Sequence, residues 1–312
     1  MTAQDLTAAP EPIRLRAARR RWGEDVVKGV LALCALLSVA TTVGIVIALF
    51  EPAIEFFGDV SIVDFLTGRE WAPLFEPAAF GVLPLVVGTI LVSFLAVLVC
   101  APFGLGAAIY MSEYASARAR KVLKPTLEVL AGIPTVVYGY FALTFVAPRL
   151  EDVGLPIHQP PFSALSAALV MGVMLIPTVA SISEDAMSAV PGDLRDGAYA
   201  LGSTRMQVAS RIVVPAAISG IIASFVLAIS RAVGETMIVL IAAGGQPNLT
   251  FDPLAAVQTM TAFIGATGQG DVATGTTAYN TIFAVGATLF VMTLVINLVA
   301  IRLVRRFREV YE

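Results

Sequence analysis

The sequence predicts an all-α polytopic membrane protein with six transmembrane helices. Hydrophobic residues make up 57% of the 312 residues and charged residues only 14%, and the mean hydropathy is +0.84. A chain with so little polar surface cannot cover a water-soluble globule. Its apolar residues also gather in runs that reach the roughly 20 residues needed to cross a bilayer as a helix.

The apolar runs and the polar segments between them give the expected organisation. A basic N-terminal region covers residues 1–27, a transmembrane domain covers 28–304, and a short tail covers 305–312. The first run is longer than a signal-peptide core and lacks an Ala-x-Ala exit, so we expect it to remain as a span. The expected spans are 28–50, 81–111, 126–147, 162–183, 218–243 and 279–301, with a polar loop over 184–217 between the fourth and the fifth.

Prolines and glycines are expected to distort several of these spans. Pro102 and Gly104 lie near the end of the second run, which is long enough to be kinked or to extend beyond the bilayer. Gly132 and Pro134 interrupt the third span, and Pro177 lies in the fourth. Each of these two interruptions is either a kink packed by small residues or part of a polar path through the membrane.

The basic residues are distributed unevenly between the loops. Most of the 20 lysines and arginines lie before the first span, after the second, in the 184–217 loop or after the last span. The loops on the other side carry only Arg69 and Arg149, together with many acidic residues. By the positive-inside rule, the sequence predicts that both termini and the 184–217 loop are cytoplasmic.

Several classes of function lack their motifs in this sequence. No G-x-x-x-x-G-K-[ST] stretch occurs, so any ATP hydrolysis must come from another chain. The single histidine, His158, is expected in a solvated loop, and no H-E-x-x-H or G-x-S-x-G pattern supports an intramembrane enzyme. Cys34 and Cys100 lie within apolar runs and predict neither a disulfide nor a metal site. A secondary anion transporter stays open as an alternative, although no convincing internal repeat is visible.

The polar 184–217 loop is predicted to contain two short helices with a hinge between them. Pro191 suits the first helical position, and Gly202 suits the position just past the end of the first helix. Thr204 and Gln207 fit a capping box that opens the second helix, and Pro215 ends it.

The first of these helices has an apolar face made by Leu194, Ala198 and Leu201. Such a face either lies on the bilayer surface or docks on a partner.

One arginine lies inside a predicted span. Arg231 is about halfway along 218–243, and Glu235 follows one helical turn later on the same face. Each charge costs about 2.5–3.5 kcal/mol at the bilayer centre on insertion scales, so we expect the two to pair. Either the pair locks two helices together, or it forms a polar step in a solute path. In the second case the planar guanidinium binds phosphate-type oxygens, Glu235 holds it in place, and Thr236 adds a hydroxyl donor.

The spacing of residues in the loop carries a family resemblance. The pattern E-A-A-x3-G-x9-I-x-L-P, the cytoplasmic loop signature of bacterial ABC importer permeases, is matched by Asp196, Gly197, Ala198, Gly202, Ile212 and Pro215. Asp196, Gly197 and Val214 stand where Glu, Ala and Leu are usual. In such permeases this loop is the coupling helix, which docks in a groove of a separate ATPase subunit. The resemblance therefore implies an ATPase-coupling role for these six residues and for Leu201.

Longer segments resemble the PstC-type permease subunit of the bacterial phosphate ABC importer, a member of the MetI-like permease family. The similar blocks are 80–115, 127–143, 196–215 and 230–245, and the last contains R-A-x-G-E-T-M. The resemblance implies import of inorganic phosphate across the bacterial inner membrane, with Arg231 and Glu235 needed for its passage. A sulfate or molybdate permease is the nearest alternative, because another tetrahedral oxyanion would also bind Arg231.

The same resemblance implies a set of partners. These are a PstA-type permease, a PstB-type ATPase homodimer that binds ATP and Mg, and a PstS-type phosphate-binding protein. It implies no cofactor or metal in this chain, contact with membrane lipid, and no nucleic-acid partner.

Overall fold

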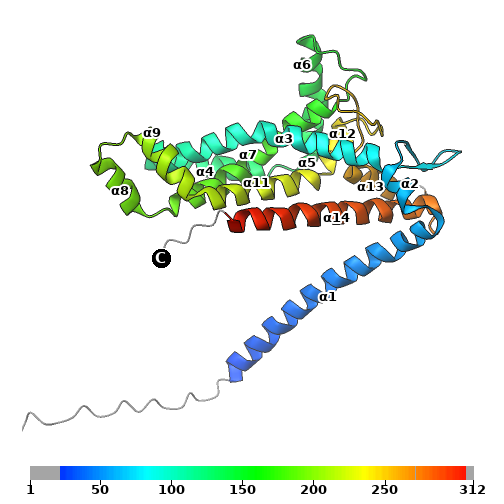
Figure 1. The fold of residues 1–312 in the computed structure, drawn as a ribbon, viewed down its shortest axis with the longest axis horizontal. Coiled ribbons are helices and arrows are strands. Elements are labelled where there is room, and N and C mark those ends of the chain that lie inside the picture. Colours follow the sequence, from blue (N-terminus) through cyan, green and yellow to red (C-terminus); the bar gives the residue numbers. More distant parts are fainter. Residues whose placement is uncertain (1–21, 271, 307–312) are drawn as a thin grey trace, which may run out of the picture. The chain divides into compact units, whose positions relative to one another are not determined.

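The computed structural model describes residues 22–270 and 272–306, and the chain is mostly helical (Figure 1). The chain divides into two compact units, Met1–Ala48 and Leu49–Glu312. The predicted N-terminal region lies outside the described residues as far as residue 21, as does the predicted tail from residue 307. The longer helices are α1 (Trp22–Asp59), α3 (Leu83–Ile109), α4 (Ala117–Ala131), α7 (Ala164–Ser188), α11 (Ile218–Val233) and α14 (Thr277–Arg306).

Shorter elements connect these helices. They are α2 (Ile62–Thr67), the antiparallel strands β1 (Trp71–Ala72) and β2 (Ala79–Phe80), α5 (Thr135–Phe141), α6 (Ala147–Asp152), α8 (Gly192–Ala200), α9 (Arg205–Val208), α10 (Val214–Ala216), α12 (Met237–Ala242) and α13 (Met260–Gly268). Three π-helical turns join adjacent helices: η1 (Tyr110–Tyr114), η2 (Ala142–Val146) and η3 (Ala209–Val213).

The described residues contain four to six candidate spans, a range that includes the six that the sequence predicts. Four helices are long and apolar enough to cross a membrane: Gly23–Asp59, Leu83–Tyr114, Ala164–Ser188 and Thr277–Arg302. Two bent pairs meet the same criterion together, namely Ala117–Ala131 with Thr135–Asp152, bent by 86°, and Arg205–Ala216 with Ile218–Val233, bent by 71°. Counting each bent pair as one span gives up to six. The all-α polytopic fold class is confirmed.

The described part of the first unit, residues 22–48, is the N-terminal part of α1. Its large apolar side chains are exposed along the helix, with Leu33 and Ile45 each 64% exposed. A helix that is hydrophobic all round needs lipid or another protein around it.

The core of the second unit lies where α3, α7 and α11 pack together (Figure 1). Glycines bring α3 and α7 into close contact. A Cβ added at Gly172 of α7 would lie 2.6 Å from the Val99 Cβ, and one at Gly104 of α3 would lie 2.8 Å from the Val179 Cβ. Small residues of this kind let membrane helices approach closely. α3 continues through Pro102 and Gly104 to Ile109 and is extended by η1, so this span is over-long and uninterrupted, which agrees with the second of the two expected alternatives.

The third span bends sharply between α4 and α5, at Gly132–Pro134. Tyr138 of α5 donates its hydroxyl to the Leu130 carbonyl across the bend, with 2.8 Å between the oxygens. A Cβ at Gly139 would meet the Ile241 side chain of α12 at 2.9 Å. These contacts favour a kink packed by neighbouring residues over the alternative of a lined path at this point.

α2 and α13 lie at the end of the second unit remote from α8 (Figure 1). Aromatic residues pack there. Phe65, Trp71 and Phe263 make edge-to-face contacts that join α2, β1 and α13. His158 is exposed, as expected of a solvated residue, and it also approaches Asp252, with Nε2 and Oδ2 2.7 Å apart. Two hydrogen bonds to its carboxylate lower the pKa of Asp252. The larger effect comes from the backbone N–H of Leu254 and the smaller one from the His158 side chain. The two loops that carry His158 and Asp252 are thus tied together.

The glycine contact between α3 and α7 gives a direct stability prediction. Gly172→Ala should lower the free energy of unfolding by about 1–3 kcal/mol, because the new methyl group overlaps Val99 and the Ala96 carbonyl. Gly106→Ala is the matched control, since a Cβ at Gly106 meets nothing within 4 Å. Thermal unfolding of the two purified variants in detergent measures the difference. Equal midpoints would contradict the close packing of these helices.

Candidate functional site

The 184–217 loop folds as two short helices joined by a tight turn, as predicted. α8 ends at Ala200, and Gly202 follows in the left-handed conformation with φ of +79°. Thr204 and Gln207 form the predicted capping box at the start of α9. Two boundaries differ from expectation: α7 extends to Ser188, inside the predicted loop, and Pro191 is the residue before the first helical position. The positive φ at Gly202 favours a residue without a Cβ at this hinge.

The residues of the loop signature divide into exposed and buried groups. Asp196, Gly197 and Gly202 are exposed, and Leu201 is 88% exposed. Ala198, in contrast, is only 6% exposed. The prediction that Leu194, Ala198 and Leu201 form one face for a partner is therefore wrong for Ala198. Because this residue lies on the side of α8 that faces the chain, it packs into a buried cluster with Val208 and Val213.

The far end of the signature connects the loop to the fifth span. Ile212 is half-buried against the same cluster, within η3, while Pro215 is exposed in α10. The helical segment Arg205–Ala216 then bends by 71° into Ile218–Val233. Pro215 thus ends the second helix of the loop to within one residue, as the sequence predicts. The exposed apolar side chains that are left for a partner are Leu194, Tyr199, Leu201 and Met206.

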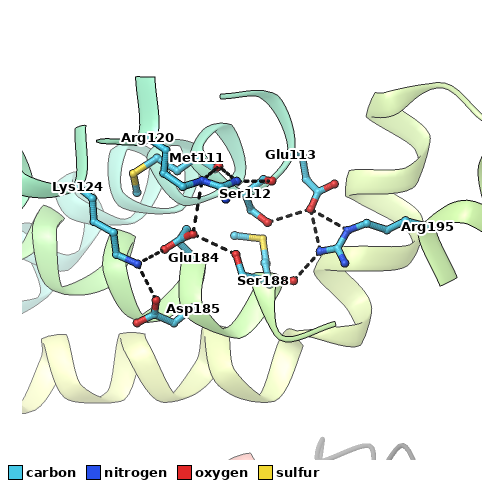
Figure 2. Close-up of polar contacts among 10 residues, drawn as sticks. Met111, Ser112, Glu113, Arg120, Lys124, Glu184, Asp185, Ser188 and Arg195 are labelled. Atoms are coloured by element: carbon cyan, nitrogen blue, oxygen red, sulfur yellow. Dashed lines mark hydrogen bonds and ion pairs between the residues drawn. The ribbon is translucent and has the colours of Figure 1, made fainter. Parts of the chain in front are cut away.

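A polar network that the sequence did not reveal joins α8 to the ends of α3 and α7. Figure 2 shows the Arg195 guanidinium of α8 between these two ends. Its Nη2 lies 3.1 Å from Oε1 of Glu113, whose side chain is only 5% exposed. It also donates from Nη2 to the Met187 carbonyl at 2.7 Å and from Nη1 to the Val190 carbonyl at 2.6 Å. The last carbonyls of a helix have no partner within it, so Arg195 satisfies the C-terminal end of α7.

A second buried acid organises the other half of this network (Figure 2). Glu184 of α7 is 3% exposed and accepts from Lys124 Nζ at 2.7 Å and from the Ser188 hydroxyl at 3.0 Å. Arg120 donates to the carbonyls of Met111 and Ser112 in η1. α4, η1, α7 and α8 are therefore joined through charged groups.

The sequence contained one signal for this network. Glu113 and Glu184 stand at the ends of long apolar runs, near a cluster of basic residues at 118–124. Burial of such acids requires basic partners. The identity of those partners depends on the packing of α4 and α8, which the pattern did not reveal.

The fifth span is broken between Arg231 and Glu235. α11 ends at Val233, Gly234 caps it, and α12 begins at Met237. The expected pairing of Arg231 with Glu235 is therefore wrong: no ion pair within 4.0 Å joins these two described residues. A pair four residues apart needs a continuous helix, and the break removes that geometry.

Glu235 is satisfied by the backbone of the next helix instead. Its Oε1 accepts the N–H groups of Met237 at 3.0 Å and Ile238 at 3.3 Å, and the residue is 9% exposed. A carboxylate at this position caps a helix and is stabilised by the free N–H groups there. The Thr261 hydroxyl donates to the Glu235 carbonyl at 2.6 Å, whereas Thr236 is half-buried and donates only to the Gly234 carbonyl at 3.4 Å.

Arg231 is left with an exposed guanidinium. Its Nη1 donates to the Thr178 hydroxyl of α7 at 3.3 Å, and within the described ranges 22–270 and 272–306 no carboxylate lies within ion-pair distance. Thr178 also lines a cavity of about 250 Å³ between α4 and α7. A guanidinium carries five N–H donors, so most of those of Arg231 are available to an external anion.

Comparison with known proteins places these features in a family context. Residues 101–309 match the family model described as binding-protein-dependent transport system inner membrane component. The chain is 36% identical over 283 residues to the probable ABC transporter permease protein YqgH of Bacillus subtilis (strain 168), covering 89% of this chain and 91% of that protein. It is 31% identical over 286 residues to the phosphate transport system permease protein PstC of Mesorhizobium japonicum, covering 85% of each.

Solved structures support the fold. A bacterial ABC transporter involved in the import of the acidic polysaccharide alginate has a chain that superposes with a TM-score of 0.62 at 20% identity, over 92% of this chain and 99% of that chain. An inward-facing MetNI methionine ABC transporter superposes with a TM-score of 0.54 at 20% identity, over 73% of this chain and 95% of that chain. At these identities, the likeness is one of fold.

The capping contact of Glu235 can be tested separately from any transport measurement. Glu235→Ala removes the acceptor for two backbone N–H groups and should lower the free energy of unfolding by about 1–2 kcal/mol. Glu235→Gln keeps one acceptor oxygen and should lose less. Glu128→Ala, at an exposed residue of α4, is the control. If the Ala substitutions at 235 and 128 shift the unfolding midpoint equally, Glu235 is not a helix cap.

Proposed function

The chain belongs to the family of binding-protein-dependent transport system inner membrane components, and we propose that it carries inorganic phosphate. It is a multi-pass membrane permease subunit of an ABC importer rather than an enzyme in its own right. Phosphate is favoured because relatives with about 30% identity over most of the chain are named as phosphate transport permeases, among them PstC of Mesorhizobium japonicum.

The exposed guanidinium of Arg231 carries this proposal. A charge on a membrane helix costs about 2.5–3.5 kcal/mol if it faces lipid, so an exposed Arg231 is better explained by an aqueous path or a partner surface. Glu235 does not neutralise it, because its carboxylate is bound to the start of α12. The planar guanidinium can donate two parallel N–H···O hydrogen bonds to two oxygens of a tetrahedral oxyanion.

The energy for import comes from another subunit in this proposal. The sequence has no nucleotide-binding loop. The exposed residues Leu194, Tyr199, Leu201 and Met206 of α8 and α9 would enter a groove on a PstB-type ATPase homodimer, which binds ATP and Mg. A PstA-type permease would complete the path, and a PstS-type protein would deliver phosphate. The positive-inside rule supports a cytoplasmic position for both termini and α8 in this proposal.

The first functional prediction concerns Arg231. Proteoliposomes that contain the chain with its co-expressed ATPase, partner permease and binding protein should take up radiolabelled phosphate when ATP is enclosed. Arg231→Gln should reduce this uptake about 100-fold, because charge-assisted hydrogen bonds worth about 3 kcal/mol are lost. Assembly of the complex should persist, since Arg231 makes only one hydrogen bond within the described chain.

Two controls make this test specific. Arg69→Gln removes the same charge from an exposed residue between α2 and β1 and should leave uptake unchanged. Sulfate and molybdate should compete poorly with phosphate. Uptake of either one in preference to phosphate would replace the proposed substrate, and loss of the assembled complex in Arg231→Gln would favour a structural role for this side chain.

The second functional prediction concerns the hinge in the coupling loop. Gly202→Val should separate ATP hydrolysis from phosphate uptake, because a β-branched residue cannot easily adopt the φ of +79°. Gly192→Val is the control, because Gly192 has no positive φ and a Cβ there meets nothing within 4 Å. The number of phosphate ions taken up per ATP hydrolysed should fall about 10-fold for Gly202→Val alone. A normal ratio would exclude the hinge from coupling.

A further inference from the structure

One side chain, Arg195, adds directional hydrogen bonds to the apolar packing of Ala198 that holds α8 against the rest of the chain. Arg195 reaches three acceptors. They are the carboxylate of Glu113 in η1 (Figure 2), the carbonyl of Met187 in the last turn of α7, and the carbonyl of Val190 in the short connection between α7 and α8. Its side chain is 19% exposed, and that of Glu113 is 5% exposed. Arg195 therefore faces into the chain, although it lies between the exposed residues Leu194 and Asp196.

Only arginine has the shape that this position requires. The guanidinium is a rigid planar group that donates in several directions at once, whereas the lysine ammonium is a single compact charge on a flexible stem. A lysine at 195 would keep the charge opposite Glu113 but could not also reach the carbonyls of both Met187 and Val190. Arg195→Lys therefore removes the hydrogen-bond geometry of the guanidinium and keeps the positive charge.

α7 connects this attachment point to the candidate solute site. Met187 accepts from Arg195 near one end of α7, and Thr178 accepts from Arg231 nine residues earlier on the same helix. At a rise of 1.5 Å per residue, the two contacts are about 13 Å apart along the axis. The one proline inside α7, Pro177, lies before Thr178, so the segment between the contacts is uninterrupted helix.

We propose that Arg195 is a positioning residue that makes α8 and α7 move together as one rigid body. Thr178 then transmits this movement from α7 to the Arg231 guanidinium. This inference rests on the proposed function, in that α8 receives the movement of an ATPase. In this proposal the movement passes along α7 between two contacts. One is the contact of Arg195 with the carbonyls of Met187 and Val190, and the other is that of Thr178 with Arg231. Thr178 acts through Arg231 and needs no contact with the anion itself.

The test uses the assembled importer in proteoliposomes, with inorganic phosphate as the probe and the ratio of phosphate uptake to ATP hydrolysis as the measurement. Arg195→Lys should lower this ratio about 10-fold, and Glu113→Gln, which keeps an acceptor for Arg195, should lower it less. Thr178→Val, which keeps the shape but removes the hydroxyl, should lower it as well. Arg205→Lys, at an exposed arginine of the same loop, should leave the ratio unchanged.

The double variant distinguishes a single route of transmission through α7 from two independent defects. If both contacts act through α7, then Arg195→Lys combined with Thr178→Val should be no worse than the more severe single variant. Multiplication of the two effects would overturn the proposal, and so would a normal ratio in Arg195→Lys.

A second measurement is independent of the substrate. Amide hydrogen exchange of residues 188–196 in the assembled complex should be about 10-fold faster in Arg195→Lys than in Arg205→Lys, because α8 is released from the end of α7. Unchanged exchange would overturn the role of Arg195 even if phosphate is transported. Faster exchange in a complex that transports no phosphate would support the role of Arg195 in attaching α8 and would reject phosphate as the substrate.

Discussion

The break in the fifth span at Gly234–Thr236 is the feature on which the candidate solute site depends. Backbone groups at membrane depth need partners within the protein, and a helix break exposes several of them. Here the free N–H groups of Met237 and Ile238 are bound by Glu235. The carboxylate that could have neutralised Arg231 is thereby fixed to the backbone, and the guanidinium stays available. One backbone irregularity thus determines the chemistry of both charged residues.

A related constraint governs the other end of the second unit. Carbonyls at and just beyond helix ends have no full set of partners within the helix. Arg120 binds those of Met111 and Ser112, and Arg195 binds those of Met187 and Val190. Helix C-termini also attract positive charge, and the acids Glu113 and Glu184 complete the pairing of these cations. The basic residues that indicate a cytoplasmic side in the sequence therefore also fasten helices together.

The sequence was sufficient for features with a local physical cause. Apolar run length identified the fold class, and Gly202, Thr204 and Gln207 identified the turn and the cap in the loop, because positive φ and capping depend on a few adjacent residues. It failed where the outcome depends on packing between distant segments. Ala198 turned inward because α9 and η3 cover it, and Arg231 lost its expected partner because the helix ends at Val233.

The loop signature combines residues with two different physical roles, and this explains why spacing alone could not assign them. Leu201 is exposed and Gly202 permits the turn that presents it, whereas Ala198 and Ile212 pack against the chain itself. A docking surface needs both a shape and a rigid base, since a loosely held helix would absorb movement instead of transmitting it. Ala198 supplies apolar packing to that base, and Arg195 beside it supplies directional hydrogen bonds. In the proposed mechanism, the residues that hold α8 in place are therefore as necessary to coupling as those on its exposed face, although they do not face the partner.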